Sequence, residues 1–165
     1  MSGIHILTTG GTIDKEYQLS TGALVLESSA ITSILEQGRN RGRVFISPVL
    51  SKDSLEMTER DRETIAVRCA LVEEAKILIT HGTDTMVETA RYLAGKKLED
   101  KTIVLVGAMI PHQLKTSDAT FNVGFGLACA SLLPAGIYIA MNGKVFDWMD
   151  VRKDKENLVF STINA

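Results

Sequence analysis

Two short turns in the sequence place a threonine directly after a glycine. Thr12 follows Gly10–Gly11, and Thr83 follows Gly82 with Asp84 next to it. A threonine hydroxyl becomes a nucleophile when a neighbouring base takes its proton, and a carboxylate or a lysine of lowered pKa can be that base. Threonine also caps helices and glycine makes turns, and on spacing alone this structural role is the more common explanation.

The histidines and cysteines give weaker signals. His81 lies between an apolar run and a glycine turn, so we expect a buried, hydrogen-bonded structural histidine rather than a general base. No two histidines have metal-ligand spacing, the two cysteines form no zinc or redox pair, and no nucleotide-binding glycine motif is present. We therefore expect no metal and no cofactor. Acidic residues whose pairing the spacing does not predict also lie near the turns: Asp14, Glu16, Asp53 and Glu56.

Composition places the chain among ordinary globular proteins. It has 165 residues, of which 45% are hydrophobic and 23% charged, and we expect a single domain over 1–165. The net charge of −2 gives no electrostatic argument for nucleic acid. No apolar run approaches the roughly 20 residues of a membrane span, and the N-terminus has no signal-peptide pattern, so we expect a cytoplasmic protein without a membrane partner.

Short apolar runs alternate with helical patterns along the whole chain. This alternation predicts an α/β fold with an open, mostly parallel sheet and helices on both faces. Asn142–Gly143 predicts a β-hairpin on the C-terminal side of the sheet, and Thr58 and Thr85 each begin a capping-box pattern. The predicted strands are 4–8, 44–47 (ended by Pro48), 77–80, 102–106, 137–141 and 144–146, and the predicted helices are 29–37, 58–72, 85–94 and 119–132. Residues 151–165 can be placed only loosely.

Several of these strands end in glycine-containing turns. In an open parallel sheet, ligands bind outside the carboxyl ends of the strands. Small turns let the backbone approach a ligand, and helix starts offer free N–H groups to an anion or an oxyanion. The sequence therefore predicts a site formed by the turns 8–12, 80–84 and 107–109.

The same turns resemble the signatures of a known family. The segments Thr8–Ile13 and Thr80–Met86, the latter followed by Glu88–Ala90, are similar to the two signatures of bacterial-type L-asparaginases, the asparaginase/glutaminase family. The likeness continues in the same order through Val106–Met109, Asp118, Phe121–Asn122 and 147–153. The resemblance implies hydrolysis of L-asparagine to L-aspartate and ammonia, without a cofactor, through a threonine nucleophile and an acyl-enzyme.

The resemblance also implies roles for particular residues. Thr12 matches the primary nucleophile, and Thr83 matches the second catalytic threonine. Asp84 matches the carboxylate that helps bind the substrate α-amino group, and Lys153 matches the lysine that partners Thr83. Tyr17 is matched to the tyrosine of a mobile loop between Thr12 and about residue 24, which closes over substrate.

Further residues are matched to substrate binding. Ser51 corresponds to the serine that binds the α-carboxylate, and Gly11, Gly82 and Ala108 belong to turns that line the substrate. Lys52 stands where the family often has glutamine. A cation there favours an additional carboxylate on the substrate, or else Lys52 and Asp53 form a solvated pair, and the two interpretations are equally supported.

The chain departs from the family in length. The usual members are about twice as long, and a C-terminal domain of a neighbouring subunit completes their active site. The resemblance implies a homodimer or homotetramer that acts on a small amino-acid amide. The alternative is an amino-acid-binding module that keeps the pocket but has lost efficient turnover; a purely structural subunit has no support in the sequence. Thr12, Thr83, Asp84 and Lys153 together favour the enzyme.

Overall fold

A six-stranded sheet forms the centre of the molecule in a computed structural model that describes residues 3–164. Its strand order is β4-β1-β5-β6-β7-β8; β4, β1, β5, β6 and β7 run parallel, and β8 pairs antiparallel with β7. The predicted fold class is therefore confirmed. The strands are β1 Ile4–Gly10, β4 Val44–Lys52, β5 Lys76–Thr80, β6 Thr102–Val106, β7 Gly136–Met141 and β8 Lys144–Asp147.

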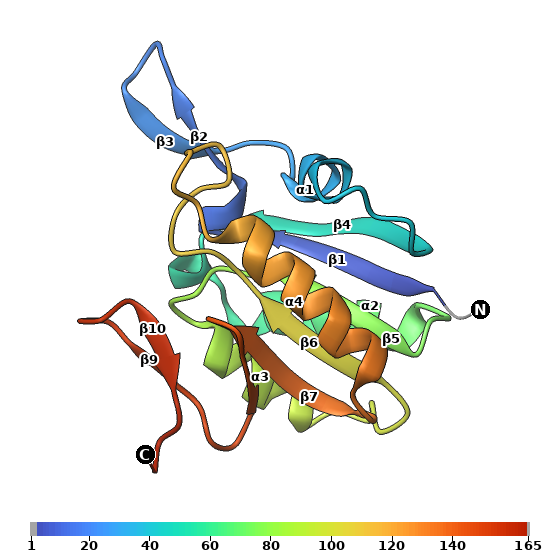
Figure 1. The fold of residues 1–165 in the computed structure, drawn as a ribbon. Coiled ribbons are helices and arrows are strands. Elements are labelled where there is room, and N and C mark those ends of the chain that lie inside the picture. Colours follow the sequence, from blue (N-terminus) through green and yellow to red (C-terminus); the bar gives the residue numbers. More distant parts are fainter. Residues whose placement is uncertain (1–2, 165) are drawn as a thin grey trace.

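Helices cover both faces of this sheet because the buried strands are apolar on both sides. Leu7 faces a core that it shares with α2 and α3, whereas its neighbour Ile6 faces the core under α1 and α4. Figure 1 shows α4 crossing one face, with α2 and α3 behind the other. The helices are α1 Ile31–Gln37, α2 Glu59–Leu71, α3 Met86–Ala94 and α4 Ala119–Leu132, with short 3-10 turns η1 Thr12–Asp14 and η2 Ser54–Glu56. Within residues 3–164, none of the helices has the length and apolar character needed to cross a membrane.

The strand order fixes where a ligand can approach. From β1 the chain passes to β4 on one side and then returns to β5 on the other side. The connections leaving β1 and β5 therefore diverge, β1 to β4 on one side and β5 to β6 on the other, and a ligand crevice is expected at the carboxyl ends of these two strands. The turns that carry Thr12 and Thr83 both lie at this switch point.

Two small antiparallel sheets lie at the same edge of the molecule. They pair β2 Lys15–Gln18 with β3 Ala23–Leu26, and β9 Arg152–Asp154 with β10 Val159–Ser161. Figure 1 shows both of them beyond the ends of β1 and β5, with the β2–β3 pair above and the β9–β10 pair below. The sequence predicted neither sheet: it predicted a mobile loop for the first segment and left the second without an assignment.

Some local predictions are confirmed and others are wrong. Thr58 and Asp61 form the predicted capping box, and Asn142 and Gly143 have the positive φ angles, 55° and 72°, that a type I′ turn requires. β4 does not end at Pro48 but continues to Lys52, because β4 is an edge strand that pairs only with β1, and an edge strand tolerates proline. The capping box predicted at Thr85 does not form, because its hydroxyl donates to the Ser54 carbonyl oxygen.

Candidate active site

The turn that carries Thr12 depends on two consecutive glycines. Gly10 and Gly11 have φ angles of 94° and 87°, in the left-handed region that disfavours other residues. The Gly11 amide donates to the Lys52 carbonyl oxygen at 3.0 Å. A Cβ atom on Gly11 would overlap the backbone of Gly82, so the turns after β1 and β5 are in direct contact. This contact brings the two predicted catalytic segments together.

Lys153 joins the second of these turns from a distant part of the chain. Its Nζ donates to Thr83 Oγ1 at 2.8 Å and lies 2.7 Å from Asp84 Oδ1. The Thr83 residue is buried, and the Lys153 side chain is only 12% exposed, whereas the Asp84 side chain is 36% exposed. A hydroxyl, an amine and a carboxylate thus form one chain of contacts through which a proton can move.

A series of amide contacts holds the strand that carries Lys153. Phe160 of β10 pairs with Lys153, and its amide donates to Asn142 Oδ1 at 2.9 Å. The Asn142 amide in turn donates to Asn122 Oδ1 at 3.2 Å, and Asn122 Nδ2 donates to the Gly107 carbonyl oxygen at 3.0 Å. These bonds connect β10 to α4 and to the turn after β6, and they keep Lys153 at the site.

Ser54 anchors the Thr83 turn from the other side. Its carbonyl oxygen accepts the Thr85 hydroxyl at 2.7 Å, and its hydroxyl accepts the Thr85 amide at 3.3 Å. The side chain lies so close to Gly82 that a Cβ there would approach Ser54 Oγ to 2.6 Å. Gly107 packs on Thr83 in a similar way, so the turn that contains the buried Ala108 also adjoins the site.

His81 is a structural residue, as the sequence predicted. It is fully buried; Nδ1 lies 2.7 Å from the Gly82 carbonyl oxygen, and Nε2 lies 2.8 Å from Thr89 Oγ1. Nδ1 must carry a proton, because a carbonyl oxygen only accepts. Burial lowers the pKa of His81 to about 4; the Gly82 hydrogen bond partly opposes this effect, and the nearby positive charge of Arg62 adds a smaller lowering. The ring is therefore neutral near pH 7.

Ser51 and Lys52 lie at the end of β4, beside the first glycine turn. Gly10 pairs with Lys52, and Ser51 is exposed in the neighbouring position. The Lys52 ammonium lies 2.9 and 3.0 Å from the two carboxylate oxygens of Asp61 at the start of α2. This contact lowers the pKa of Asp61 to about 2. The solvated pair of Lys52 with Asp53 is therefore wrong, and a contact of Lys52 with substrate stays a prediction.

Tyr17 lies on the β2–β3 hairpin and is 49% exposed. Its backbone amide donates to Gln113 Oε1 at 2.6 Å, and its hydroxyl lies near Gly22 at the tip of the hairpin. These contacts do not bring the ring to Thr12. The role of Tyr17 as a loop tyrosine stays a prediction that requires the hairpin to move.

A third ion pair, which the sequence did not predict, lies beside the first glycine turn. Lys15 Nζ is 2.6 Å from Asp53 Oδ2, and the two side chains are 24% and 30% exposed. The Lys15 hydrogen bond is the main reason that the pKa of Asp53 is lowered, and the charge of Lys153 contributes as well. The carboxylate of Asp53 is therefore affected by Lys15, which follows the Thr12 turn, and by Lys153, which contacts the Thr83 turn.

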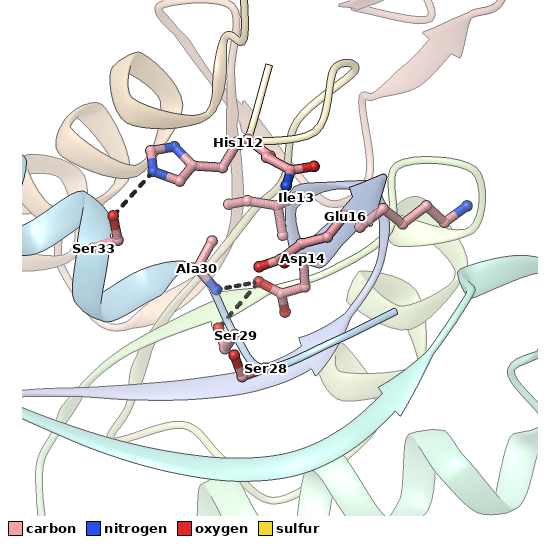
Figure 2. Close-up of a pocket in the computed structure, with 10 residues that line it drawn as sticks. Ile13, Asp14, Glu16, Ser28, Ser29, Ala30, Ser33 and His112 are labelled. Atoms are coloured by element: carbon pink, nitrogen blue, oxygen red, sulfur yellow. Dashed lines mark hydrogen bonds between the residues drawn. The ribbon is translucent and has the colours of Figure 1, made fainter. Parts of the chain in front are cut away.

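A pocket of about 360 Å³ adjoins the Thr12 turn (Figure 2). Figure 2 shows Asp14 in its wall, with one carboxylate oxygen that accepts the Ala30 amide at 2.9 Å and the Ser29 hydroxyl at 3.1 Å. Burial raises the pKa of Asp14, and these two bonds partly oppose it. The residues that line the pocket include none of the predicted catalytic residues Thr12, Thr83, Asp84 and Lys153. Asp14 therefore fixes α1 and the start of the hairpin relative to the Thr12 turn.

The residues matched to the chemistry of the site could be named from the sequence, whereas the residues that hold the site in place could not. Ser54, Asn122 and Asn142 act through contacts between segments far apart in the chain, which no local pattern indicates. The pairing of Lys15 with Asp53 spans 38 positions and has the same cause. Asn122 belongs to a segment of the family resemblance and Asn142 to the predicted hairpin turn, but neither signal indicated these contacts.

Fold and site together define a class of protein: a doubly wound α/β domain with two threonine-bearing turns at its switch point and a lysine–carboxylate pair on one of them. The family model described as "Asparaginase, N-terminal" matches residues 3–163. The chain belongs to the asparaginase family.

Individual relatives agree with this assignment. The chain is 30% identical to a glutaminase-asparaginase of Acinetobacter glutaminasificans over 92% of its length, and 29% identical to L-asparaginase 2 of Escherichia coli over 99%. Among solved structures, the thermostable L-asparaginase from Thermococcus kodakarensis matches 99% of the chain with a TM-score of 0.82 and 29% identity. The matched part is 50% of each of the two curated relatives and 52% of the solved chain, so this chain spans about half of their length.

Proposed function

We propose that the protein hydrolyses the side-chain amide of L-asparagine to L-aspartate and ammonia through an acyl-enzyme on Thr12. The observation that carries this proposal is the position of Lys153 Nζ, in contact with both Thr83 Oγ1 and Asp84 Oδ1. A domain that only binds an amino acid has no need for an amine aligned with a buried threonine hydroxyl. The names of two of the relatives, L-asparaginase 2 and glutaminase-asparaginase, support the same chemistry.

In the first half of the reaction, Thr12 Oγ attacks the amide carbon, and its proton enters the chain of contacts formed by Thr83 Oγ1, Lys153 Nζ and Asp84. Asp84 Oδ1, 2.7 Å from Lys153 Nζ, stabilises positive charge on the lysine during this transfer. The C–N bond then breaks, the leaving nitrogen takes a proton, and ammonia departs. In the second half, water attacks the ester carbon, and the Thr12 hydroxyl is regenerated with release of aspartate.

The negative charge on the amide oxygen needs hydrogen-bond donors in both tetrahedral intermediates. The Gly11 amide already donates to the Lys52 carbonyl oxygen, so it is not available for this purpose. We assign the oxyanion contact at the first turn to the Thr12 amide. Gly82 and Ala108 line the opposite side of the substrate, and Ser51 takes the α-carboxylate.

The assembly and the location of the protein are part of the same proposal. We propose a homodimer or homotetramer in which a neighbouring copy covers the open side of the crevice. Two partly exposed ion pairs and an exposed Ser51 on that side favour such a cover. We propose a cytoplasmic location; a relative from Campylobacter jejuni, described as a probable cytoplasmic L-asparaginase, is 30% identical over 98% of this chain, with a TM-score of 0.82.

Ammonia release from L-asparagine by the purified protein tests the proposal, with ligand-induced thermal stabilisation measured on the same samples. Release of ammonia that scales with protein concentration supports the enzyme. A rise in Tm with asparagine but no ammonia would replace the enzyme by the amino-acid-binding module. L-Glutamine, which is one methylene longer, serves as the second substrate and measures the amide preference.

A further inference from the structure

The Ser47 cluster, formed by Ser47, His5 and Glu74, lies at the amino ends of β1 and β4 and has no part in the proposed reaction. His5 Nε2 lies 2.8 Å from Ser47 Oγ, and His5 Nδ1 lies 2.8 Å from Glu74 Oε2. The histidine ring therefore joins a hydroxyl on one side to a carboxylate on the other. A serine hydroxyl becomes a nucleophile through this order of groups at such distances.

The strand register brings these side chains together on one face of the sheet. His5 of β1 pairs with Phe45 of β4, and Leu7 pairs with Ser47. Because side chains alternate along a strand, His5 and Ser47 both lie on the face of Leu7, which α2 and α3 cover. Glu74 reaches the ring from the connection between α2 and β5. Three separate segments of the fold therefore hold the cluster in place.

The hydrogen bonds of the cluster give His5 the form of a general base. A carboxylate only accepts hydrogen bonds, so His5 Nδ1 carries a proton and donates it to Glu74. In the neutral ring Nε2 is then an acceptor, and the Ser47 hydroxyl donates to it. The His5 hydrogen bond lowers the pKa of Glu74, burial partly opposes this effect, and the charge of Arg43 adds a smaller lowering. Glu74 is therefore ionised and orients the ring toward the serine.

The cluster reaches the surface at an edge of the sheet. The side chains of His5 and Glu74 are 13% and 17% exposed, and Ser47 is partly exposed as well. Phe45 stacks on the His5 ring with centroids 5.9 Å apart, and Arg43 Cζ lies 5.0 Å from the centre of the Phe45 ring. β4 is an edge strand, whose outer N–H groups have no partner strand. One strand therefore carries the nucleophile, an apolar wall and donors for an oxyanion.

This place is well separated from the crevice at the other end of the sheet. Gly10 follows His5 by five positions in β1, which at about 3.3 Å for each residue is about 16 Å. Lys52 follows Ser47 by the same number of positions in β4. Figure 1 shows the amino ends of β1 and β4 on the side opposite the two small sheets. Chemistry at Ser47 therefore does not depend on Thr12.

We propose that Ser47 is the nucleophile of a second catalytic site, which takes the acyl group of small carboxylic esters with His5 as its general base. Ser47 Oγ bonds to the ester carbonyl carbon while its proton passes to His5 Nε2. The C–O bond to the alcohol then breaks, and the alcohol leaves with the proton from His5. Water next attacks the acyl-serine and gives a proton to His5, which returns it to Ser47 Oγ as the carboxylic acid leaves. Glu74 is a positioning residue, because it acts only through the ring.

Labelling with an alkyl fluorophosphonate tests the nucleophile, because an activated serine forms a bond from Oγ to phosphorus and releases fluoride. Ser47 and Ser51 lie in one tryptic peptide, 44–52, and fragment masses assign the label. Ser51 is the matched control: it is more exposed, and among residues 3–164 it has no hydrogen bond to a histidine. We expect the label on Ser47 and none on Ser51. An unlabelled Ser47 would overturn the proposal.

A second histidine close to a serine supplies a control for the base. His5→Gln should slow the labelling of Ser47 by about 10²-fold or more, because an amide takes no proton. His112 Nε2 lies 3.4 Å from Ser33 Oγ, but within residues 3–164 no carboxylate bonds to its ring. His112→Gln should leave the labelling of Ser47 unchanged. An unchanged rate in His5→Gln, with Tm close to that of the wild type, would exclude His5 as the base. If His5→Gln does not fold, the comparison of Ser47 with Ser51 in the wild-type protein decides.

Hydrolysis of p-nitrophenyl acetate tests the activity itself. Ser47→Ala should reduce release of p-nitrophenol to the background rate, while ammonia release from L-asparagine stays at the wild-type rate. The two measurements therefore distinguish failure of this site from failure of the proposed function. Glu74→Gln should lower kcat for the ester about tenfold or more with KM nearly unchanged, as expected of a residue that orients the base. A cluster that only ties β1 to β4 would lose Tm in Glu74→Gln without this change in kcat, and wild-type ester hydrolysis by Ser47→Ala would refute the second site.

Discussion

Replacement of His81 by glutamine should remove part of the fall in the free energy of unfolding that the protein shows as the pH is lowered. The ring is fully buried, with Nδ1–H donating to the Gly82 carbonyl oxygen and Nε2 accepting from Thr89. The Thr89 hydroxyl also accepts Arg62 Nε at 3.1 Å. A second ring proton on Nε2 would meet this hydroxyl and the nearby guanidinium charge, so the folded protein resists protonation.

The magnitude follows from the pKa of His81, which is lowered from 6.5 to about 4 in the folded state. As the pH falls, the unfolded chain therefore takes up the proton first. The His81 contribution to stability is complete above about pH 7 and is lost as the pH falls from about 6.5 toward 4. At 1.36 kcal/mol for each pH unit, the loss is about 3 kcal/mol.

Urea denaturation at a series of pH values measures this loss. His81→Gln keeps an acceptor for Thr89 and does not titrate, so the difference between the two proteins isolates the histidine. Asp61, with a pKa of about 2, and Asp14, with a raised pKa, are present in both proteins and cancel. We expect the wild-type free energy of unfolding to fall relative to that of the variant by about 3 kcal/mol between pH 7 and 4. If the free energies of unfolding of the two proteins changed in parallel with pH, His81 would be protonated as easily in the folded protein as in the unfolded chain.

Three further predictions concern the site. Gly11→Ala should lower the free energy of unfolding by about 3 kcal/mol or more, because φ is 87° at this position and a Cβ would overlap Gly82. Urea denaturation measures this change. A loss below about 1 kcal/mol would show that the turns after β1 and β5 can separate. Lys153→Met should lower kcat for ammonia release by about 10²-fold to 10⁴-fold with little change in Tm, and an unchanged kcat would remove the lysine from the proton path. Asn142→Ala should lower the free energy of unfolding by about 1–3 kcal/mol and should also lower kcat, because the Phe160 amide loses its acceptor. Urea denaturation measures the first effect and ammonia release the second. A loss of stability with an unchanged kcat would mean that the position of Lys153 does not depend on this contact.

The local parts of the fold could be predicted from the sequence because their causes are local. Apolar runs identified the strands of the main sheet, and Asn142–Gly143 identified the turn between β7 and β8. Thr58 and Asp61 identified the start of α2. The same local logic was wrong at Thr85, where a carbonyl oxygen 31 positions away competes for the hydroxyl. Propensity does not account for such tertiary competition.

The site could be predicted only in part from the sequence, for the same reason. The switch-point argument correctly brought the glycine turns of β1 and β5 together. Lys153 contacts Thr83, as the resemblance implied, and its catalytic role stays a prediction. The β2–β3 hairpin was missed because its strands are short and half exposed, without a clear alternation. Lys15 and Asp53 were missed as a pair because ion pairing between distant segments leaves no trace in either segment alone.

The rate of ammonia release from L-asparagine by Thr12→Ala, relative to the wild-type protein, tests the central claim most directly. Thr12 is partly exposed at the first glycine turn, so the loss of its hydroxyl should leave Tm nearly unchanged. The account predicts a fall in kcat of about 10³-fold or more, since no other group replaces the attacking oxygen. Turnover at the wild-type rate in Thr12→Ala would contradict the account and move the nucleophile to another residue, with Thr83 beside Lys153 the first to examine.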